Sequence, residues 1–412
     1  MSNHQYSIVL TVTYVPYILV QIPSNLLLKR IGANILLPAM ITLWGFTSMM
    51  QGFVNSYKGI IVCRCFLGLF EGGLLPGMTL YFTSLYPRGA LQFRIAVVFA
   101  TSALAGAFSG LLASAIIEME GMGGRHGWAW IFILEGIFTI LFGIASFVLL
   151  PRTLADARFL SAADKEYLRA RLHEEGMTET NIKDHFNWAD VIEAFKLPQV
   201  LLLAITGFFS GSTQGGLAYF EPSIVASLGY TSSRAQLMSV PPFAVAFVLC
   251  IVTALIADRY NARGLTAAGW SLISLIGFAM WLGSHSKSVR YGSLFLSVSA
   301  VNGLAPAIGA WNANNVAPYT RRATALAILT IFTNGGGILA TWLLGSLSLP
   351  PNYTKAALTF TIFSAGELVT VLVVLWYLLA KNREKAKHRE KESKDGNDST
   401  LGNHSAWFVY RL

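Results

Sequence analysis

The stretch Gly59–Phe82, GIIVCRCFLGLFEGGLLPGMTLYF, is apolar along its length except for two charged side chains, Arg64 and Glu71. A helix of about 20 apolar residues crosses the hydrocarbon core of a bilayer, so this stretch predicts a membrane-spanning helix. A charge at that depth costs about 2.5 kcal/mol or more, and such residues often mark a transport pathway. Arg64 and Glu71 are therefore the first candidates for a functional site.

The composition of the whole chain indicates the same class of protein. Hydrophobic residues make up 54% of the 412 residues and charged residues 12%, and the mean hydropathy is +0.54. A water-soluble protein needs a more polar surface, so we expect an integral membrane protein with many spans. The net charge of +9 does not indicate nucleic-acid binding, because the positive charges lie between and after the apolar segments.

Eleven segments are apolar and long enough to span a bilayer, and charged or turn-rich sequences separate them. The first of them lacks the basic start of a signal peptide, so it is counted as a span. The expected spans are 6–28, 34–54, 59–82, 92–115, 128–150, 199–220, 237–257, 265–284, 290–311, 323–346 and 357–380.

The distribution of Lys and Arg between alternate loops predicts the orientation of these spans. Of the 30 Lys and Arg residues, 23 fall in the loops after odd-numbered spans or in the tail, six fall in the other loops, and Arg64 lies inside a span. Positive residues favour the cytoplasm, so the C-terminus is expected inside and Met1 outside. An odd number of spans with an exported N-terminus indicates a twelve-span parent whose first helix is absent.

A polar segment divides the spans into two groups. Residues 151–198 interleave acids and bases, and Ser161 followed by Asp164 predicts a capped helix within them. Arg94 and Arg322 each follow a proline-containing turn at the start of a span, one in each group, which indicates the parallel halves of a secondary transporter. We expect an N-terminal helical bundle over 1–150, a cytoplasmic linker over 151–198, a C-terminal helical bundle over 199–380 and a cytoplasmic tail without fixed structure over 381–412.

The segment LIADRYNARG resembles the Asp-Arg-x-Gly-Arg-Arg signature of the major facilitator superfamily. Asp258 and Arg259 stand at the signature Asp-Arg and Arg263 in its basic end, while Asn261 replaces the family glycine. The resemblance implies an all-α membrane fold of two pseudo-symmetric bundles. It also implies that Asp258, Arg259 and Arg263 act as a conformational latch. In the first half, LLLKRIGAN has Lys29 where the aspartate is expected, so one of the two latches is intact.

Other segments resemble one branch of that superfamily. Arg64 and Gly68 occupy the Arg-x-x-x-Gly signature of its fourth helix. GWAWIFILEG (127–136), ARFLSAADKE (157–166) and GYTSSRAQLMSVPPF (229–243) are similar to fungal allantoate and nicotinate permeases of the anion:cation symporter branch, and WFVYRL (407–412) to their aromatic ending. In that branch an Arg and a Glu at this spacing serve anion recognition and proton sensing. The resemblance implies those roles for Arg64 and Glu71.

Helical geometry supports the pairing of these two charges. Seven residues make nearly two turns, about 10.5 Å along the axis, so Arg64 and Glu71 face the same way, and the glycines around them allow close helix packing. A guanidinium without a fixed partner is a natural receptor for an anion, and a carboxyl group at this depth is a candidate proton carrier. The alternative is a tie between Arg and Glu, or between Arg and backbone, that only holds helices together.

Other polar residues in the spans are weaker candidates. Gln214, Asn302 and Asn334 could hydrogen-bond a substrate or join helices. Glu135 and Glu367 are expected to be packing ties rather than functional groups. The chain has no phosphate loop, no zinc spacing and no Ser/His/Asp set in the spans, so we expect no enzyme activity, no cofactor and no metal.

Together these features predict a proton-coupled symporter for a small organic anion, such as allantoate, nicotinate or a related vitamin or nitrogen source. The expected partners are that anion, a proton and membrane lipid, with no nucleic acid, and we expect a monomer in the plasma membrane. Three alternatives stay open: an uncoupled uniporter or exporter of the same fold, a non-transporting membrane nutrient sensor, and an inactive truncated remnant.

Overall fold

A computed structural model describes residues 3–174, 187–229, 232–348, 353–389, 403, 405 and 407–412 of the chain. The regular elements of this described part are all helices, as expected where a bilayer forces backbone groups to pair within their own segment. The elements are α1 (Asn3–Ile31), α2 (Ala33–Gln51), α3 (Tyr57–Glu71), α4 (Leu74–Leu85), η1 (Arg88–Ala90), α5 (Leu91–Ile117), η2 (Met122–Gly124), α6 (Gly127–Leu149), α7 (Ala162–Glu174), α8 (Trp188–Lys196), α9 (Pro198–Ser227), α10 (Ser232–Tyr260), α11 (Arg263–Gly283), α12 (Lys287–Asn314), α13 (Tyr319–Trp342), η4 (Leu343–Leu347) and α14 (Thr354–Arg389).

Within the described residues, eleven helical segments are long and apolar enough to cross a membrane, which confirms the number expected from the sequence. The span expected over 59–82 differs in detail, because it consists of α3 and α4 with a break at Gly72 and Gly73. Pro76 lies in the first turn of α4. Backbone N–H groups in a first turn have no partner within the helix, so the proline, which lacks this group, costs α4 no hydrogen bond.

The end of the chain corrects another expectation. The tail was expected to lack fixed structure from Lys381, but α14 continues as one helix to Arg389. Residues 381–389 include three Lys, two Arg, one Glu and one Ala, which favour helix, and the basic residues Lys387, His388 and Arg389 in the last turn suit the negative end of the helix dipole.

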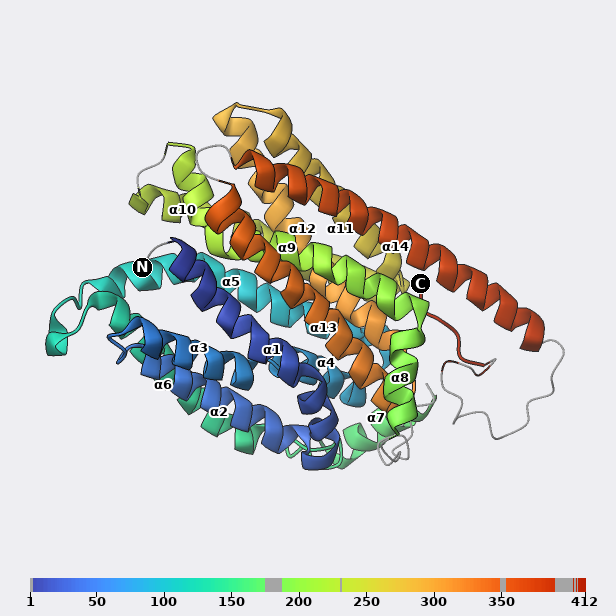
Figure 1. Cartoon of the computed structure of the whole chain (residues 1–412). Helices are drawn as coiled ribbons and strands as arrows, with labels where there is room; N and C mark the ends of the chain where they lie inside the picture. The colour runs from blue at the N-terminus through green and yellow to red at the C-terminus, as the bar shows by residue number, and fades with distance from the viewer. Residues whose placement is uncertain are drawn as a thin grey trace.

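The spans form two halves, α1–α6 and α9–α14, shown in blue to teal and in green to red in Figure 1. In the first half α2 packs along α6 and α1 along α3. In the second half α13 packs along α9, and α11 packs along both α12 and α14. Helices α7 and α8 belong to the connection between the halves.

Helix α8 fastens this connection to the second half. Asp190 of α8 forms an ion pair of 2.9 Å with Arg321 at the start of α13. Ala194 of α8 is buried in a cluster with Val200 of α9 and Ile328 of α13. The last part of the linker is therefore a docked helix rather than a loose connection.

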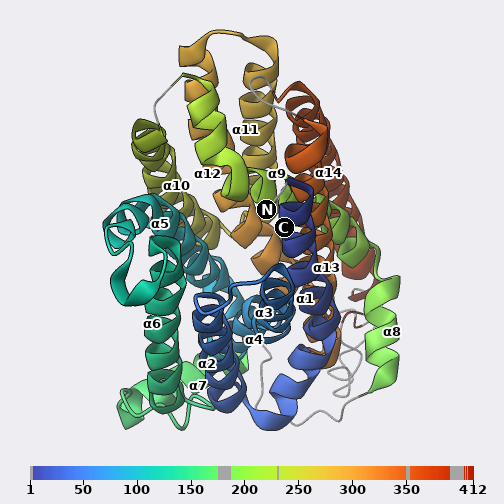
Figure 2. The same ribbon diagram turned by 60° about the vertical axis from the view of Figure 1, so that its left-hand side comes forward.

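The two halves meet along α1 with α13 and along α5 with α10 (Figure 2). At one end of the molecule the contact is broader, and a single buried cluster combines Leu28 and Leu91 of the first half with Ala313 and Ala323 of the second. We call this the latch end. It is the end formed by the turns that follow α1, α4, α10 and α12, at residues 32, 86–90, 261–262 and 315–318.

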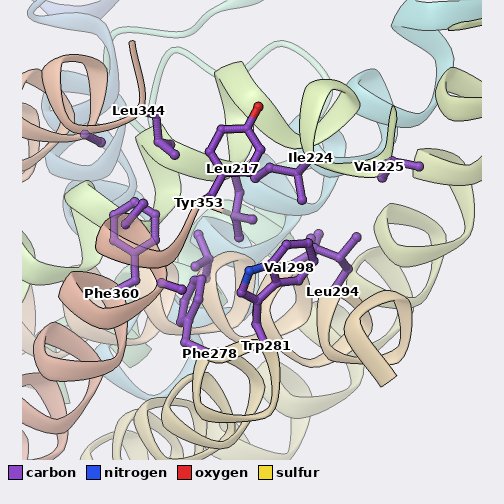
Figure 3. Close-up of a cluster of buried hydrophobic side chains, with 14 of the residues drawn as sticks. Leu217, Ile224, Val225, Phe278, Trp281, Leu294, Val298, Leu344, Tyr353 and Phe360 are labelled. Atoms are coloured by element: carbon purple, nitrogen blue, oxygen red, sulfur yellow. The ribbon is translucent and has the colours of Figure 1, made fainter. Parts of the chain in front are cut away.

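Near the opposite end the second half has an apolar core of its own (Figure 3). Phe278 and Trp281 of α11 pack there with Phe360 of α14, and the rings of Phe278 and Phe360 are 5.3 Å apart. The cavity in this cluster measures about 30 Å³, which is room for little more than one water molecule. This region therefore stabilises the second half and is too small to hold an organic substrate.

Candidate functional site

The two predicted charges lie on α3. This helix begins after Ser56, whose hydroxyl accepts the backbone N–H of Gly59 at 3.1 Å, and it ends at Glu71. Arg64 and Glu71 are both half-buried. In the described part of the chain neither forms an ion pair, and the Nε of Arg64 is buried without a hydrogen-bond partner. The charges thus share one helix, nearly two turns apart, without the internal pairing that would make Arg64 a structural tie.

Glycines on the same side of α3 bring α1 against this helix. A Cβ on Gly68 would meet the carbonyl of Thr13 and would lie 3.1 Å from Cγ of Pro16. A Cβ on Gly72 would lie 2.9 Å from Cα of Tyr17. No side chain fits between the two backbones, so the expected close packing is confirmed, and α1 forms a wall beside the charged pair.

The three predicted amides lie on three helices of the second half. Asn302 of α12 is buried, and its amide donates to the carbonyl of Val298 at 2.8 Å. Asn334 of α13 is half-buried and donates to Thr330 O at 2.8 Å. Gln214 of α9 is half-buried. Among the described residues no hydrogen bond joins these amides to Arg64 or Glu71, so the structure places the candidates in both halves without a hydrogen bond between the two groups.

The predicted latch residues Asp258 and Arg263 join the halves at the latch end. One oxygen of Asp258 accepts the backbone N–H of Gln92 at 3.2 Å and the other accepts that of Phe93 at 2.8 Å. These N–H groups belong to the first turn of α5 and have no partner within that helix. Arg263 is fully buried, pairs with Asp258 at 2.9 Å and also donates to the carbonyl of Arg88.

The structure explains why Asn261 replaces the family glycine in this motif. Asn261 has φ of 51°, in the left-handed region that asparagine tolerates better than other residues with a side chain. The positive φ turns the chain between α10 and α11 and brings Arg263 back to Asp258. Arg259 is exposed on the last turn of α10 and lies outside this network.

The first half contributes a different contact at the same end. Lys29, which stands where the latch aspartate is expected, lies 5.2 Å from the ring centroid of Tyr319 on α13. One turn earlier, Asn25 is buried and donates its amide to Ala323 O at 3.1 Å. The end of α1 thus joins the second half through a cation–π contact and an amide rather than through a carboxylate.

The two weaker carboxyl candidates lie in different surroundings. Glu135 is exposed on α6. Glu367 of α14 is fully buried, and neither of its carboxyl oxygens has a hydrogen-bond partner in the described residues. Neither residue forms an ion pair there, so the packing ties expected for their side chains are absent from the described part.

Sequence reasoning missed the polar residues that bind the C-terminal segment at the latch end. Asn315 follows α12 directly, and its buried side chain bonds the backbone of Arg411. Asn382 and Lys385 of α14 bond the backbone of the same segment. The available signal was the WFVYRL ending, whose aromatic residues are unusual in a tail that is otherwise polar.

Glu120 and Tyr410 are among the groups outside the spans whose pKa values are shifted. The pKa of Glu120, between α5 and α6, is lowered because the backbone N–H of Gly127 and the ring of His126 stabilise its carboxylate. Burial raises the pKa of Tyr410 in the C-terminal segment. Three or more His, Cys, Asp or Glu side chains do not gather into a metal-binding group anywhere in the described ranges.

Comparison with known proteins relates this geometry to a family. The sequence profile described as Major Facilitator Superfamily matches residues 1–313. An uncharacterized transporter of Schizosaccharomyces pombe is 33% identical over 390 residues, which cover 94% of this chain and 77% of that protein. The high-affinity nicotinic acid transporter of Saccharomyces cerevisiae is 30% identical over 385 residues, which cover 93% of this chain and 71% of that protein.

Solved structures show the same arrangement of helices at much lower sequence identity. The proton:xylose symporter XylE superposes with a TM-score of 0.69 at 14% identity, over 90% of this chain and 86% of that one. The Escherichia coli fucose:proton symporter FucP superposes with a TM-score of 0.66 at 13% identity, over 90% and 91%. At such identities the likeness concerns the fold alone.

Proposed function

The chain belongs to the major facilitator superfamily, and from this premise we propose that it carries a small organic anion and a proton together across the membrane by alternating access. The observation that carries the proposal is the state of Arg64. Its guanidinium lies in a membrane-spanning helix, and its buried Nε has no hydrogen-bond partner in the described part. A membrane-embedded cation that no ion pair holds in the described part is suited to receive an anion.

Glu71 is the proposed proton carrier. It lies on the same helix as Arg64, seven residues further along, and no ion pair holds it in the described part. A negative charge on Glu71 competes with an anionic substrate for the field of Arg64, because all three lie in a region of low dielectric constant. Protonation of Glu71 removes that competition, so anion and proton favour the same state of the protein.

The remaining predicted residues have supporting roles in this proposal. Gln214, Asn302 and Asn334 are proposed to bind the polar groups of the substrate from the second half. Asp258 and Arg263 are proposed to hold the latch end closed, and Arg259 is proposed to add to the basic character of that turn. We take the latch end as the cytoplasmic end, in agreement with the bias of positive charge in its loops.

The proposed substrate class is a monocarboxylate of vitamin or nitrogen-source size. Support comes from the similarity to a nicotinic acid transporter and from the allantoate and nicotinate permease-like segments of the sequence. A single guanidinium binds a carboxylate through two parallel hydrogen bonds, which suits a substrate with one such group. We propose the plasma membrane as the location and a monomer as the working unit.

Uptake of radiolabelled nicotinate and allantoate by cells that lack their own carriers tests the proposal. The expected result is accumulation that depends on an inward proton gradient and stops in Arg64→Gln. Uptake that does not depend on the proton gradient would instead favour an uncoupled carrier. A folded protein at the cell surface that takes up neither compound would favour a sensor or an inactive remnant.

A further inference from the structure

The last residues of the chain are bound to the latch end rather than free (Figure 1). Asn382 of α14 accepts the N–H of Tyr410 at 2.9 Å and donates to its carbonyl at 2.8 Å. The side chain of Asn315 binds the backbone of the following residue, Arg411, in the same way. It accepts the N–H of Arg411 at 2.8 Å and donates to the carbonyl of Arg411 at 2.9 Å. Consecutive residues of a β-like strand present their backbone groups to opposite sides, so two asparagines hold this segment between α14 and α12.

The same segment satisfies buried donors of the latch. The indole N–H of Trp311, which is fully buried on α12, donates to Arg411 O at 2.9 Å. The backbone N–H of Arg263, the first residue of α11, donates to Leu412 O at 3.0 Å. Buried donors need acceptors, so the C-terminal residues complete the surroundings of the Asp258–Arg263 turn.

One side chain of the segment reaches the first half directly. The guanidinium of Arg88, in the turn between α4 and α5, lies 4.8 Å from the ring centroid of Phe408. The carbonyl of Arg88 accepts from Arg263, and from the amide of Asn314 at 3.3 Å. The second half therefore holds the backbone of Arg88 through the latch, and the C-terminal segment holds its side chain.

Lys385 fixes the position of Phe408. Its ammonium group donates to the carbonyls of Asn403 at 2.6 Å, Ser405 at 2.8 Å and Phe408 at 3.3 Å. It also lies 4.8 Å from the ring centroid of Tyr410. These three hydrogen bonds hold the C-terminal segment in place, because release of the segment would require water to replace each of them.

We propose that residues Trp407–Leu412, the C-terminal strap, position Arg88 and the Asp258–Arg263 turn and so hold the latch end closed. The strap contacts both halves through Arg88 and Arg263, so opening of the latch end separates partners that the strap now holds together. This inference rests on the proposed function only in that opening of the latch end is a step of alternating access. Asn315, Asn382 and Phe408 are its positioning residues.

Cys250 is a natural reporter of that opening. It lies on α10 at the seam between the halves, is 1% exposed, and packs with Ala96 and Ala100 of α5. The position is eight residues, about 12 Å, from Asp258 along the helix. Separation of α5 from α10 at the latch end would expose its thiol. Replacement of Cys63 and Cys65 by alanine leaves Cys250 as the single cysteine of the full-length chain.

The experiment measures the rate at which a small maleimide labels Cys250 in the purified protein. In Phe408→Ala the rate should rise roughly two- to thirty-fold, the range that corresponds to loss of one cation–π contact. Phe408→Tyr keeps the aromatic face and should label at the parental rate. The matched control is Val409→Ala, since Val409 is the exposed neighbour of Phe408 on the same strap and should also label at the parental rate.

A second variant protects the test against misfolding. This variant is a chain that ends at residue 406. If it is monodisperse after size exclusion, its Cys250 should be labelled faster than that of Phe408→Ala. If it is not monodisperse, Phe408→Ala alone decides the question. A parental labelling rate in a folded Phe408→Ala variant would overturn the proposed role of the strap. An increase in the labelling rate of Val409→Ala equal to that of Phe408→Ala would also overturn it. Labelling needs no substrate, so the two tests are independent. The proposed role of the strap can be confirmed even if the protein takes up neither nicotinate nor allantoate, and it can be refuted even if uptake is observed.

Discussion

Asp258 and Arg263 pair at 2.9 Å across the turn between α10 and α11, and the arginine side chain has no exposed surface. The same carboxylate accepts two backbone N–H groups at the start of α5, in the other half of the molecule. One aspartate therefore neutralises a buried cation within its own half and caps a helix of the opposite half. Separation of the halves must break both sets of bonds or exchange them for water.

Replacement of Asp258 by alanine should destabilise the protein and open the latch end. It leaves the buried Arg263 charge unpaired, a change that costs about 3–5 kcal/mol, and removes a helix cap worth about 1 kcal/mol. We expect a lower thermal unfolding midpoint and faster labelling of Cys250.

Arg259→Ala is the matched control, because Arg259 is the exposed neighbour of Asp258. Its stability should change by no more than about 0.5 kcal/mol. Equal losses in the two variants would show that the turn as a whole, and not the buried pair, holds the latch end.

Arg64 should be essential for recognition of the anion. Arg64→Gln removes the charge and should abolish uptake, while Arg64→Lys keeps the charge without the planar fork and should raise the KM about tenfold or more. Initial rates over a range of nicotinate concentrations separate the KM from the maximal rate. Cys65→Ser, at the exposed neighbouring position, should leave the KM unchanged. Normal kinetics in Arg64→Lys would argue against a bidentate anion receptor.

Glu71→Gln should uncouple transport from protons. A permanently neutral side chain imitates the protonated state, so exchange of labelled for unlabelled substrate should continue, while accumulation driven by an imposed pH gradient should cease. Glu135→Gln removes an exposed membrane carboxyl group instead and should keep the response to the gradient. A gradient response that persists in Glu71→Gln would transfer the coupling role to another group, and the buried Glu367 is the next candidate.

The spans and the charged pair could be predicted because both depend on local sequence. Hydropathy over about 20 residues identifies a span without reference to its neighbours, and the helical period alone places Arg64 and Glu71 on one side of a helix. The break at Gly72–Gly73 escaped prediction, since glycines in an apolar segment are compatible with one continuous helix as well as with two.

The latch end could be predicted only in part, because most of its bonds join residues far apart in the chain. Asp258 and Arg263 were found through a motif of adjacent residues. Asn315 and Asn382 carry no such signal, since their role follows from a segment that begins more than twenty residues after Asn382 and returns to the bundle. Tail composition indicates a lack of structure, and the docking site that supplies structure is formed by the folded helices.

The close approach of α3 to α1 beside the charged pair should depend on Gly68. A Cβ added there would overlap the backbone carbonyl of Thr13, which cannot move aside as a side chain could. Gly68→Ala should therefore lower stability by about 1–3 kcal/mol, as overpacking of a tight contact does. The matched control is Gly269→Ala on α11, where a Cβ meets nothing within 4 Å and the change should be neutral or stabilising by up to about 1 kcal/mol. Thermal unfolding in detergent compares the two variants, and equal midpoints would show that α1 can withdraw from α3 at little cost.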